Sequence, residues 1–184
     1  MKHEYKLLIA CILAGAIFGA LAGFGAATLM PKSQDQLISD FYATEMAASV
    51  SPSDFVSELK NGNAEGIAID LRSSGEYAQG HLVGALNIPS VEMNSQQLIA
   101  AFQKLPKDKP AILYCYSSYC MLSKSVGKTL ADNGIYAKDF SAGWYEIKRD
   151  FSDYIVNGTQ PGELQISQGD SGQICTTSGG EFHC

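Results

Sequence analysis

The stretch PAILYCYSSYCMLSKSVGKTLAD, residues 110–132, has the pattern of a strand, a short loop and a helix in succession. Residues 110–115 form an apolar run without polar alternation, which is typical of a strand buried on both faces of a parallel sheet. Residues 122–132 read as a helix that ends at Asn133-Gly134. Cys115 therefore closes a buried strand, and residues 116–121 connect it to a helix.

The same alternation continues on both sides of this stretch. A further apolar run of strand length occupies residues 66–71, and residues 136–140 are a candidate for a third strand. Helices are predicted over residues 93–105 and 144–151, and after a start signal at Ser51-Pro52. Strands that alternate with helices form a parallel sheet covered on both faces, so the sequence predicts a doubly wound α/β fold. The pattern leaves the order of the strands open.

Cys115 is the first candidate for chemistry. A loop that leads into a helix N-terminus directs free backbone N–H groups toward its own centre. We expect these dipoles to stabilise a thiolate at Cys115 and to lower its pKa. An anionic group on the sulfur would be cradled by the same loop, which comprises Tyr116, Ser117, Ser118, Tyr119, Cys120 and Met121. On this local evidence, a buried structural cysteine is an equal alternative.

Cys120 is a second candidate, five residues further along the chain. A curved loop would bring its sulfur to that of Cys115, and an oxidising compartment would favour a disulfide between them. Cys120 would then resolve a persulfide or sulfenic acid on Cys115, or the pair would exchange electrons as a dithiol. The alternative is that Cys120 only packs against the helix.

Several spaced motifs resemble the signature of rhodanese domains. The first half of that resemblance lies in Asp70-Leu71-Arg72, Glu76-Tyr77, Gly80-His81, Gly84-Ala85 and Asn87-Ile88-Pro89. The second half lies in the strand that ends at Tyr114-Cys115, the helix with Ser123, Asn133-Gly134 and Ala142-Gly143-Trp144. The resemblance covers residues 50–153, which is most of the chain beyond its apolar N-terminal block.

The resemblance implies a sulfur-transfer mechanism with Cys115 as the nucleophile. Cys115 would attack a sulfane-sulfur donor, hold the sulfur as a persulfide and pass it to a thiol acceptor, which is covalent catalysis in two steps. No cofactor and no metal are implied. Supporting roles, mainly in holding the surrounding loops, fall to Asp70, Arg72, Glu76 and His81.

The loop departs from the family pattern in its charges. Rhodanese loops commonly carry Arg beside the cysteine and near the end of the loop, where this chain has Tyr116 and then Cys120 or Met121. Lys124 is the nearest positive residue, so we expect weak capture of anionic donors such as thiosulfate. Met121 also replaces the Arg that phosphatase relatives of this fold require, which excludes phosphate-ester hydrolysis.

An apolar block precedes the domain. Residues 7–30 contain no charge, and a helix of that length would span about 36 Å, enough to cross a bilayer. Lys2 and Lys6 favour a cytoplasmic N-terminus, so the domain is expected outside the cytoplasm, in the periplasm of a bacterium. A cleaved signal peptide, with Gly25-Ala26-Ala27 near the cleavage site, is the alternative. Gly15, Gly19 and Gly23 share one helix face and would permit a homodimer.

These observations divide the chain into an anchor (1–32), a helical stalk (33–49), a rhodanese-like domain (50–156) and an irregular tail (157–184). In the tail, Cys175 and Cys184 are expected to form a disulfide, and a zinc site that includes His183 is a weaker alternative. The net charge of −6 and the absence of a basic run argue against nucleic-acid binding.

Three functional hypotheses follow from the sequence. The leading one is an anchored sulfurtransferase or persulfide carrier that uses Cys115. The second is a thiol–disulfide redox protein that uses Cys115 and Cys120 equally. The third is a binding module that retains the fold without catalysis, which the missing loop arginines favour.

Overall fold

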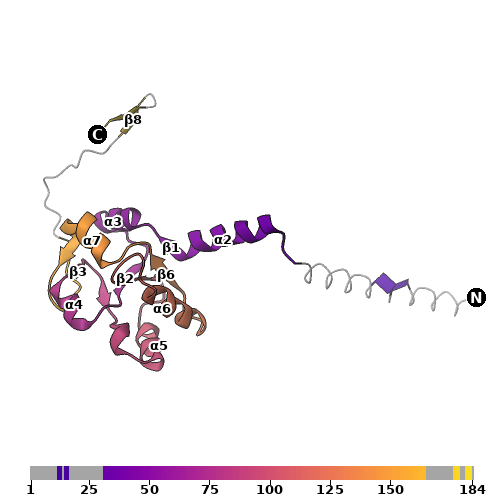
Figure 1. The fold of residues 1–184 in the computed structure, drawn as a ribbon, viewed down its shortest axis with the longest axis horizontal. Coiled ribbons are helices and arrows are strands. Elements are labelled where there is room, and N and C mark those ends of the chain that lie inside the picture. Colours follow the sequence, from indigo (N-terminus) through magenta and orange to yellow (C-terminus); the bar gives the residue numbers. More distant parts are fainter. Residues whose placement is uncertain (1–11, 14, 17–30, 165–175, 179–180, 184) are drawn as a thin grey trace, which may run out of the picture. The chain divides into compact units, whose positions relative to one another are not determined.

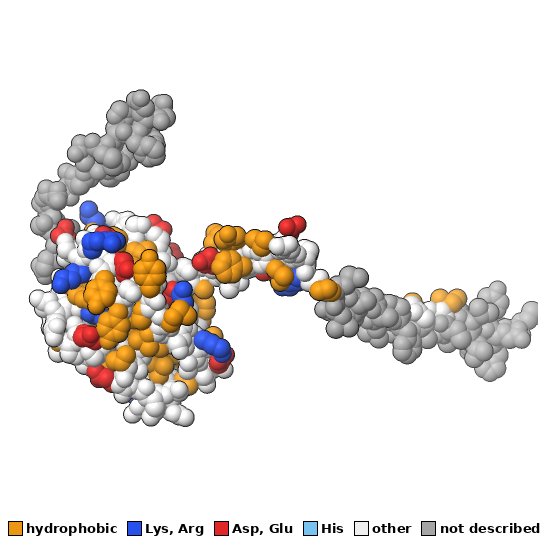
Figure 2. Space-filling view, viewed as in Figure 1, with side chains coloured by type: hydrophobic (Ala, Val, Ile, Leu, Met, Phe, Trp, Pro, Cys, Tyr) orange, Lys and Arg blue, Asp and Glu red, His pale blue; other side chains and the backbone are white. Residues whose placement is uncertain are grey.

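A computed structural model describes residues 12–13, 15–16, 31–164, 176–178 and 181–183 (Figure 1). The chain divides into two units, residues 1–44 and 45–184. Helix α2 (Gln34–Ala48) forms where the stalk was predicted. Figure 2 shows apolar side chains on its surface. Leu37, Phe41 and Met46 are exposed. Within the described ranges, no helix is long and apolar enough to cross a bilayer; most of residues 7–30, with Gly19 and Gly23, lie outside those ranges.

The second unit is built on a five-stranded sheet in the order β1-β6-β5-β2-β4. Every neighbouring pair in it is parallel, which confirms the predicted α/β fold. The strands are β1 (Ser49–Val50), β2 (Ile67–Asp70), β4 (Leu86–Asn87), β5 (Ala111–Tyr114) and β6 (Ala137–Phe140). The three four-residue strands are the predicted ones. β1 and β4 have two residues each, too few to show a pattern in the sequence.

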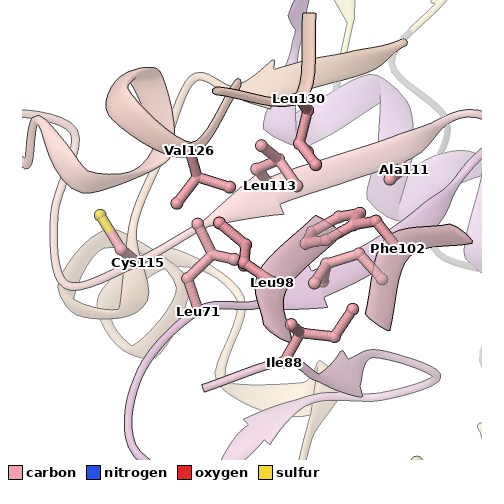
Figure 3. Close-up of a cluster of buried hydrophobic side chains, with 10 residues drawn as sticks. Leu71, Ile88, Leu98, Phe102, Ala111, Leu113, Cys115, Val126 and Leu130 are labelled. Carbon is pink, nitrogen blue, oxygen red and sulfur yellow. The ribbon is translucent and has the colours of Figure 1, made fainter. Parts of the chain in front are cut away.

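Helices cover both faces of this sheet, as a doubly wound fold requires. On one face α5 (Ser95–Gln103) and α6 (Leu122–Ala131) contribute Leu98, Phe102, Val126 and Leu130 to a buried cluster, drawn in Figure 3. On the other face, α3 (Pro52–Lys60) and α7 (Trp144–Asp150) contribute Phe55 and Ile147 to a second cluster. Alternate residues of β5 serve the two clusters, so Leu113 and Cys115 face the first and Ile112 and Tyr114 the second.

Side-chain caps fix where several helices begin. The Asn94 side chain accepts from the N–H of Gln97, so α5 begins at Ser95 and not at residue 93. A similar capping box joins Ser73 and Glu76 at the start of α4 (Ser74–Gln79), a short helix that periodicity alone does not reveal. The two 3₁₀ turns are η1 (Ser90–Glu92) and η2 (Ser152–Tyr154).

Two small antiparallel pairs complete the described structure. β3 (His81–Leu82) pairs with β7 (Ile155–Val156), which returns the chain to the motif region before residue 157. In the tail, predicted to be irregular, β8 (Thr176–Ser178) pairs with β9 (Glu181–His183). β-branched Thr176 and Thr177 and aromatic Phe182 are residue types that favour such pairing. Cys175 and Cys184 lie outside the described residues, and their disulfide stays a prediction.

Candidate functional site

Cys115 follows β5 directly, at the carboxyl edge of the sheet, where α/β folds place their sites. Its side chain is 1% exposed and belongs to the first buried cluster (Figure 3). The thiol donates a long hydrogen bond to the carbonyl oxygen of Cys120, with 3.9 Å between sulfur and oxygen. The loop therefore curves back over the cysteine from which it starts.

Burial reverses the expected acidity of Cys115. Desolvation raises the pKa of this thiol to about 11, and the neighbouring Cys120 side chain acts in the same direction. Backbone N–H groups of Ser123 and Tyr116 do lower the pKa, as predicted for such a loop, but their effect is smaller. The prediction of a lowered pKa is therefore wrong, because burial destabilises the thiolate more than the loop amides stabilise it.

Cys120 is the more acidic of the two thiols. It is half-buried, and that burial acts to raise its pKa. The neighbouring Cys115 side chain and the backbone N–H groups of Leu122 and Tyr116 outweigh that effect, so the pKa of Cys120 lies below its ordinary value. The N–H of Cys120 donates to the Ser117 carbonyl at 3.0 Å, which closes the turn that brings the sulfurs together. Cys120 thus both packs against the core and contacts Cys115.

One side of the loop is held through Tyr116, which stands where rhodanese loops commonly carry Arg. Its hydroxyl donates to Glu76 Oε2 at 2.9 Å. Burial, followed by this hydrogen bond, raises the pKa of Tyr116 to about 12. Hydrogen bonding from the Ser73 hydroxyl is the main cause that lowers the pKa of Glu76. Glu76 therefore positions the loop as an ionised acceptor, which fits the supporting role that the resemblance implies.

The other side of the loop is held by the start of α7. The backbone N–H and Oγ of Ser118 donate to Glu146 at 3.1 and 3.0 Å, and the N–H of Gly143 donates to the same carboxylate at 2.9 Å. The Trp144 N–H donates to the Cys115 carbonyl at 2.7 Å. A Cβ on Gly143 would lie 2.2 Å from the Ser117 nitrogen, so only glycine permits this approach.

Glu146 was not predicted as a site residue. It follows Ala142-Gly143-Trp144 and is the third residue of α7, where a carboxylate commonly caps a helix. That spacing is the one signal in the sequence that indicates its place. Burial acts to raise its pKa, but hydrogen bonds from Gly143 and Ser118 lower it overall, so Glu146 is ionised beside the loop.

Asp70 and Arg72 form a buried ion pair beneath the site. Arg72 Nη2 lies 2.6 Å from Asp70 Oδ2 and 2.7 Å from the Gly80 carbonyl oxygen. The guanidinium also covers the Trp144 ring, 4.1 Å from its centroid. Arg72 therefore ties β2, α4 and α7 together, and all its contacts are structural.

His81 is buried and is also held by the backbone. Nδ1 lies 2.9 Å from the Tyr77 carbonyl oxygen, and Nε2 lies 3.0 Å from the carbonyl oxygen of Gln160. The ring stacks on Tyr77 at 3.6 Å between centroids. None of these partners belongs to the Cys115 loop, so His81 is placed to support the fold around β3.

The surface of the loop is apolar and flanked by negative charge. Tyr119 is 90% exposed and Met121 is 68% exposed. The two carboxylates that hold the loop, Glu76 and Glu146, are both ionised at neutral pH, and residues 116–121 include no Lys or Arg. This site is poorly suited to a small anionic donor.

Solved structures with the same fold include the BH2092 protein of Bacillus halodurans, at 20% identity and a TM-score of 0.57 over 73% of this chain and 96% of that one. An As-Sb reductase from Leishmania major aligns at 17% identity and a TM-score of 0.50, over 61% of this chain and 87% of the other. At these identities the likeness concerns the fold.

Curated relatives include the HTH-type transcriptional regulator Rv0324 of Mycobacterium tuberculosis, 27% identical over 120 residues, and the protein YqhL of Bacillus subtilis, 32% identical over 77. These alignments cover 60% and 42% of this chain. The chain spans about half the length of each relative, 51% and 56%.

A family profile matches over residues 51–150, under the description rhodanese-like domain. The matched segment contains Cys115, its loop, and the supports from Glu76 and Glu146. Because this segment is more than half of the chain, the protein belongs to the rhodanese-like family.

Proposed function

We propose that this protein is a sulfurtransferase that carries sulfane sulfur as a persulfide on Cys115. The supporting observation is the place of Cys115 at the carboxyl end of a central strand, under a loop held by Tyr116 and Glu146. The Cys115 thiolate attacks the sulfane sulfur of the donor, a new S–S bond forms, and the donor leaves with the electron pair of its broken bond. A thiol acceptor then takes the outer sulfur in the same way.

The donor is proposed to be a persulfide of a thiol compound or protein, not thiosulfate. The loop lacks the arginines that are common in the family, and Glu76 and Glu146 lie beside it. A dianionic donor is therefore disfavoured at this surface. The exposed Tyr119 and Met121 offer apolar contact area instead. Such a surface suits a donor whose sulfur is presented on a larger, uncharged or protein carrier.

Thiol–disulfide exchange is a second candidate function. It is favoured by one specific observation, the hydrogen bond from the Cys115 thiol to the Cys120 carbonyl oxygen, which folds the loop so that both cysteines pack in the first buried cluster. Two thiols brought together by one short loop can be oxidised to a disulfide if their geometry permits it. In this reading both residues are needed equally.

The anchor and the location are proposals that the sequence supports. Residues 7–30 would hold the protein in a membrane with the domain outside the cytoplasm, and Gly15, Gly19 and Gly23 would permit a homodimer. Membrane fractionation with protease treatment of spheroplasts tests this. Cleavage of the domain only after the spheroplasts are lysed would contradict the orientation, and recovery of the protein in the soluble fraction would contradict the anchor.

The activity is tested by measuring sulfur transfer from a small-molecule persulfide to a thiol acceptor. We expect Cys115→Ser to abolish transfer and Cys120→Ser to retain it. Full activity in Cys115→Ser would overturn the proposed function. Equal loss in both variants, together with reversible dithiol oxidation of the unmodified protein, would favour the redox candidate.

A further inference from the structure

A partly buried aspartate on the same sheet face as the thiol pair has no role in the account above. Asp139, on β6, has a buried Oδ1 atom that finds no hydrogen-bond partner among the described residues. Buried polar atoms are paired in the great majority of cases, and an unpaired carboxylate oxygen is costly. An oxygen left in this state calls for a functional explanation.

The sheet places Asp139 on the same face as Cys115. Along β6, Ala137 packs against the first buried cluster and Phe140 belongs to the second, so alternation directs Asp139 to the first. Asp139 is paired in register with Leu113, two residues before Cys115. Cys120 packs against this same cluster, and the charge of Asp139 acts on the Cys120 thiol.

We propose that Cys120 resolves the Cys115 persulfide, with Asp139 as the acceptor of the Cys120 proton. The inference rests on the proposed function, because it needs a persulfide on Cys115. The Cys120 sulfur attacks Sγ of Cys115, and an S–S bond forms between the two residues. The bond between Cys115 Sγ and the outer sulfur breaks, and that sulfur leaves as HS⁻ with the electron pair. The proton held by Asp139 then yields hydrogen sulfide.

The stoichiometry of this step shows which reactant must regenerate the protein. One persulfide and one thiol become one disulfide and hydrogen sulfide, so the donor is the oxidant. A dithiol reductant, small or protein-borne, must then reduce the Cys115–Cys120 disulfide before the next cycle.

The acidity order of the two thiols favours this direction. Cys120 is the more acidic and the more exposed thiol, which makes it the better attacking group. Burial that raises the pKa of Cys115 to about 11 makes its thiolate a poor leaving group. Since the sulfur with the lower pKa leaves faster, attack by Cys120 on the inner sulfur with loss of HS⁻ is favoured over attack by Cys120 on the outer sulfur.

Few other ionisable groups face Asp139. Lys138 alternates to the opposite face of the sheet, and Lys124 and Lys128 on α6 are exposed. On β1, the residue in register is Ser49. Within the described part of the chain, the ionisable side chains that pack in the first buried cluster are the thiols of Cys115 and Cys120 and the phenol of Tyr116.

The test uses the full-length protein in detergent, reduced and then exposed to the persulfide of an uncharged small thiol. Released sulfide is measured with time, and the Cys115 and Cys120 peptides are mapped by mass. We expect the unmodified protein to release sulfide in step with formation of the Cys115–Cys120 disulfide. Cys120→Ser should keep the persulfide on Cys115 and release sulfide at least about tenfold more slowly. Sulfide release by Cys120→Ser at the normal rate would overturn the proposal.

The variant Asp139→Asn tests whether Asp139 accepts a proton or only supports the fold. Loss of a general base commonly costs a hundredfold or more, and we expect a decrease of at least about tenfold near pH 7. The rate should recover as the pH rises, because Cys120 then loses its proton to solvent. Asp132→Asn, the same change at an exposed site, should leave the rate unchanged. An equal decrease at every pH would assign Asp139 a structural role and overturn its part in the proposal.

Persulfide formation on Cys115 distinguishes a failure of the proposed sulfur transfer from a failure of the resolving step. In the double variant Cys120→Ser, Asp139→Asn, the Cys115 peptide should still gain one sulfur atom. Failure of loading in this variant and in Cys120→Ser would overturn the proposed function itself. Normal loading with unchanged sulfide release in Cys120→Ser would overturn only the resolving step.

Discussion

The Cys115 thiol donates to the backbone carbonyl oxygen of Cys120, with Cys115 as the buried member of the pair and Cys120 as the more exposed one. The pKa values of the two thiols shift in opposite directions. Burial raises the pKa of Cys115, whereas the neighbouring Cys115 side chain and the loop amides lower that of Cys120. The nucleophile that the family assigns is thus the weaker acid of the pair.

Alkylation at neutral pH should therefore modify Cys120 before Cys115. The Cys115 rate should keep rising up to a pH of about 11, because only the thiolate reacts. The measurement is peptide mass after short iodoacetamide pulses over a pH series. Faster alkylation of Cys115 at pH 7 would contradict the acidity order.

A Tyr116→Arg variant should improve the use of thiosulfate. It replaces the hydroxyl that contacts Glu76 with a charge beside Cys115, which attracts an anionic donor. A gain of about tenfold in kcat/KM corresponds to about 1.4 kcal/mol, within the range of a charge pair near a protein surface. Tyr145→Arg, at an exposed position on α7, is the control. No difference between these two variants would show that loop charge does not limit the donor.

Gly143→Ala should displace the loop. The added methyl group would overlap the Ser117 backbone, and overpacking of this kind costs about 1–3 kcal/mol. Denaturant unfolding measures this loss, and faster alkylation of Cys115 reports the displaced loop. Gly75→Ala is the matched control, because nothing lies within 4 Å of a Cβ built there on α4. Equal stability of the two variants would argue against the close approach.

Asp70→Asn should destabilise the fold more than the loss of a surface ion pair does. It leaves Arg72 buried without its counter-charge, at a cost of about 3–5 kcal/mol. Asp132→Asn breaks the exposed pair with Lys128 and should cost about 0.5 kcal/mol or less. Comparable unfolding midpoints for the two variants would contradict the structural role given to Asp70 and Arg72.

The central strands and helices follow from the sequence because their apolar runs are long enough to show a period. β1, β3 and β4 do not, since a two-residue strand is defined by its partner and not by its own pattern. The acidity of Cys115 could not be predicted for a related reason. Loop amides are visible in the sequence, but the burial that outweighs them depends on side chains from α5, α6 and β2.

The residues around the loop differ in how readily the sequence alone reveals them. Glu76 lies in a motif, and Tyr116 beside Cys115 marks a departure from the family. Their hydrogen bond, across 40 positions of sequence, requires the folded chain. Asp139 carries no motif, and its unpaired oxygen becomes evident only once β6 lies beside β5.

The most direct measurement is the mass of the Cys115 peptide from the full-length Cys120→Ser protein, after reduction and exposure to the persulfide of an uncharged small thiol. This variant cannot remove sulfur through Cys120, so a persulfide that forms should persist. The account predicts a Cys115 peptide heavier by one sulfur atom, and no such gain when Cys115 is replaced by Ser. An unmodified Cys115 peptide at complete exposure to the donor would contradict sulfur transfer through this residue.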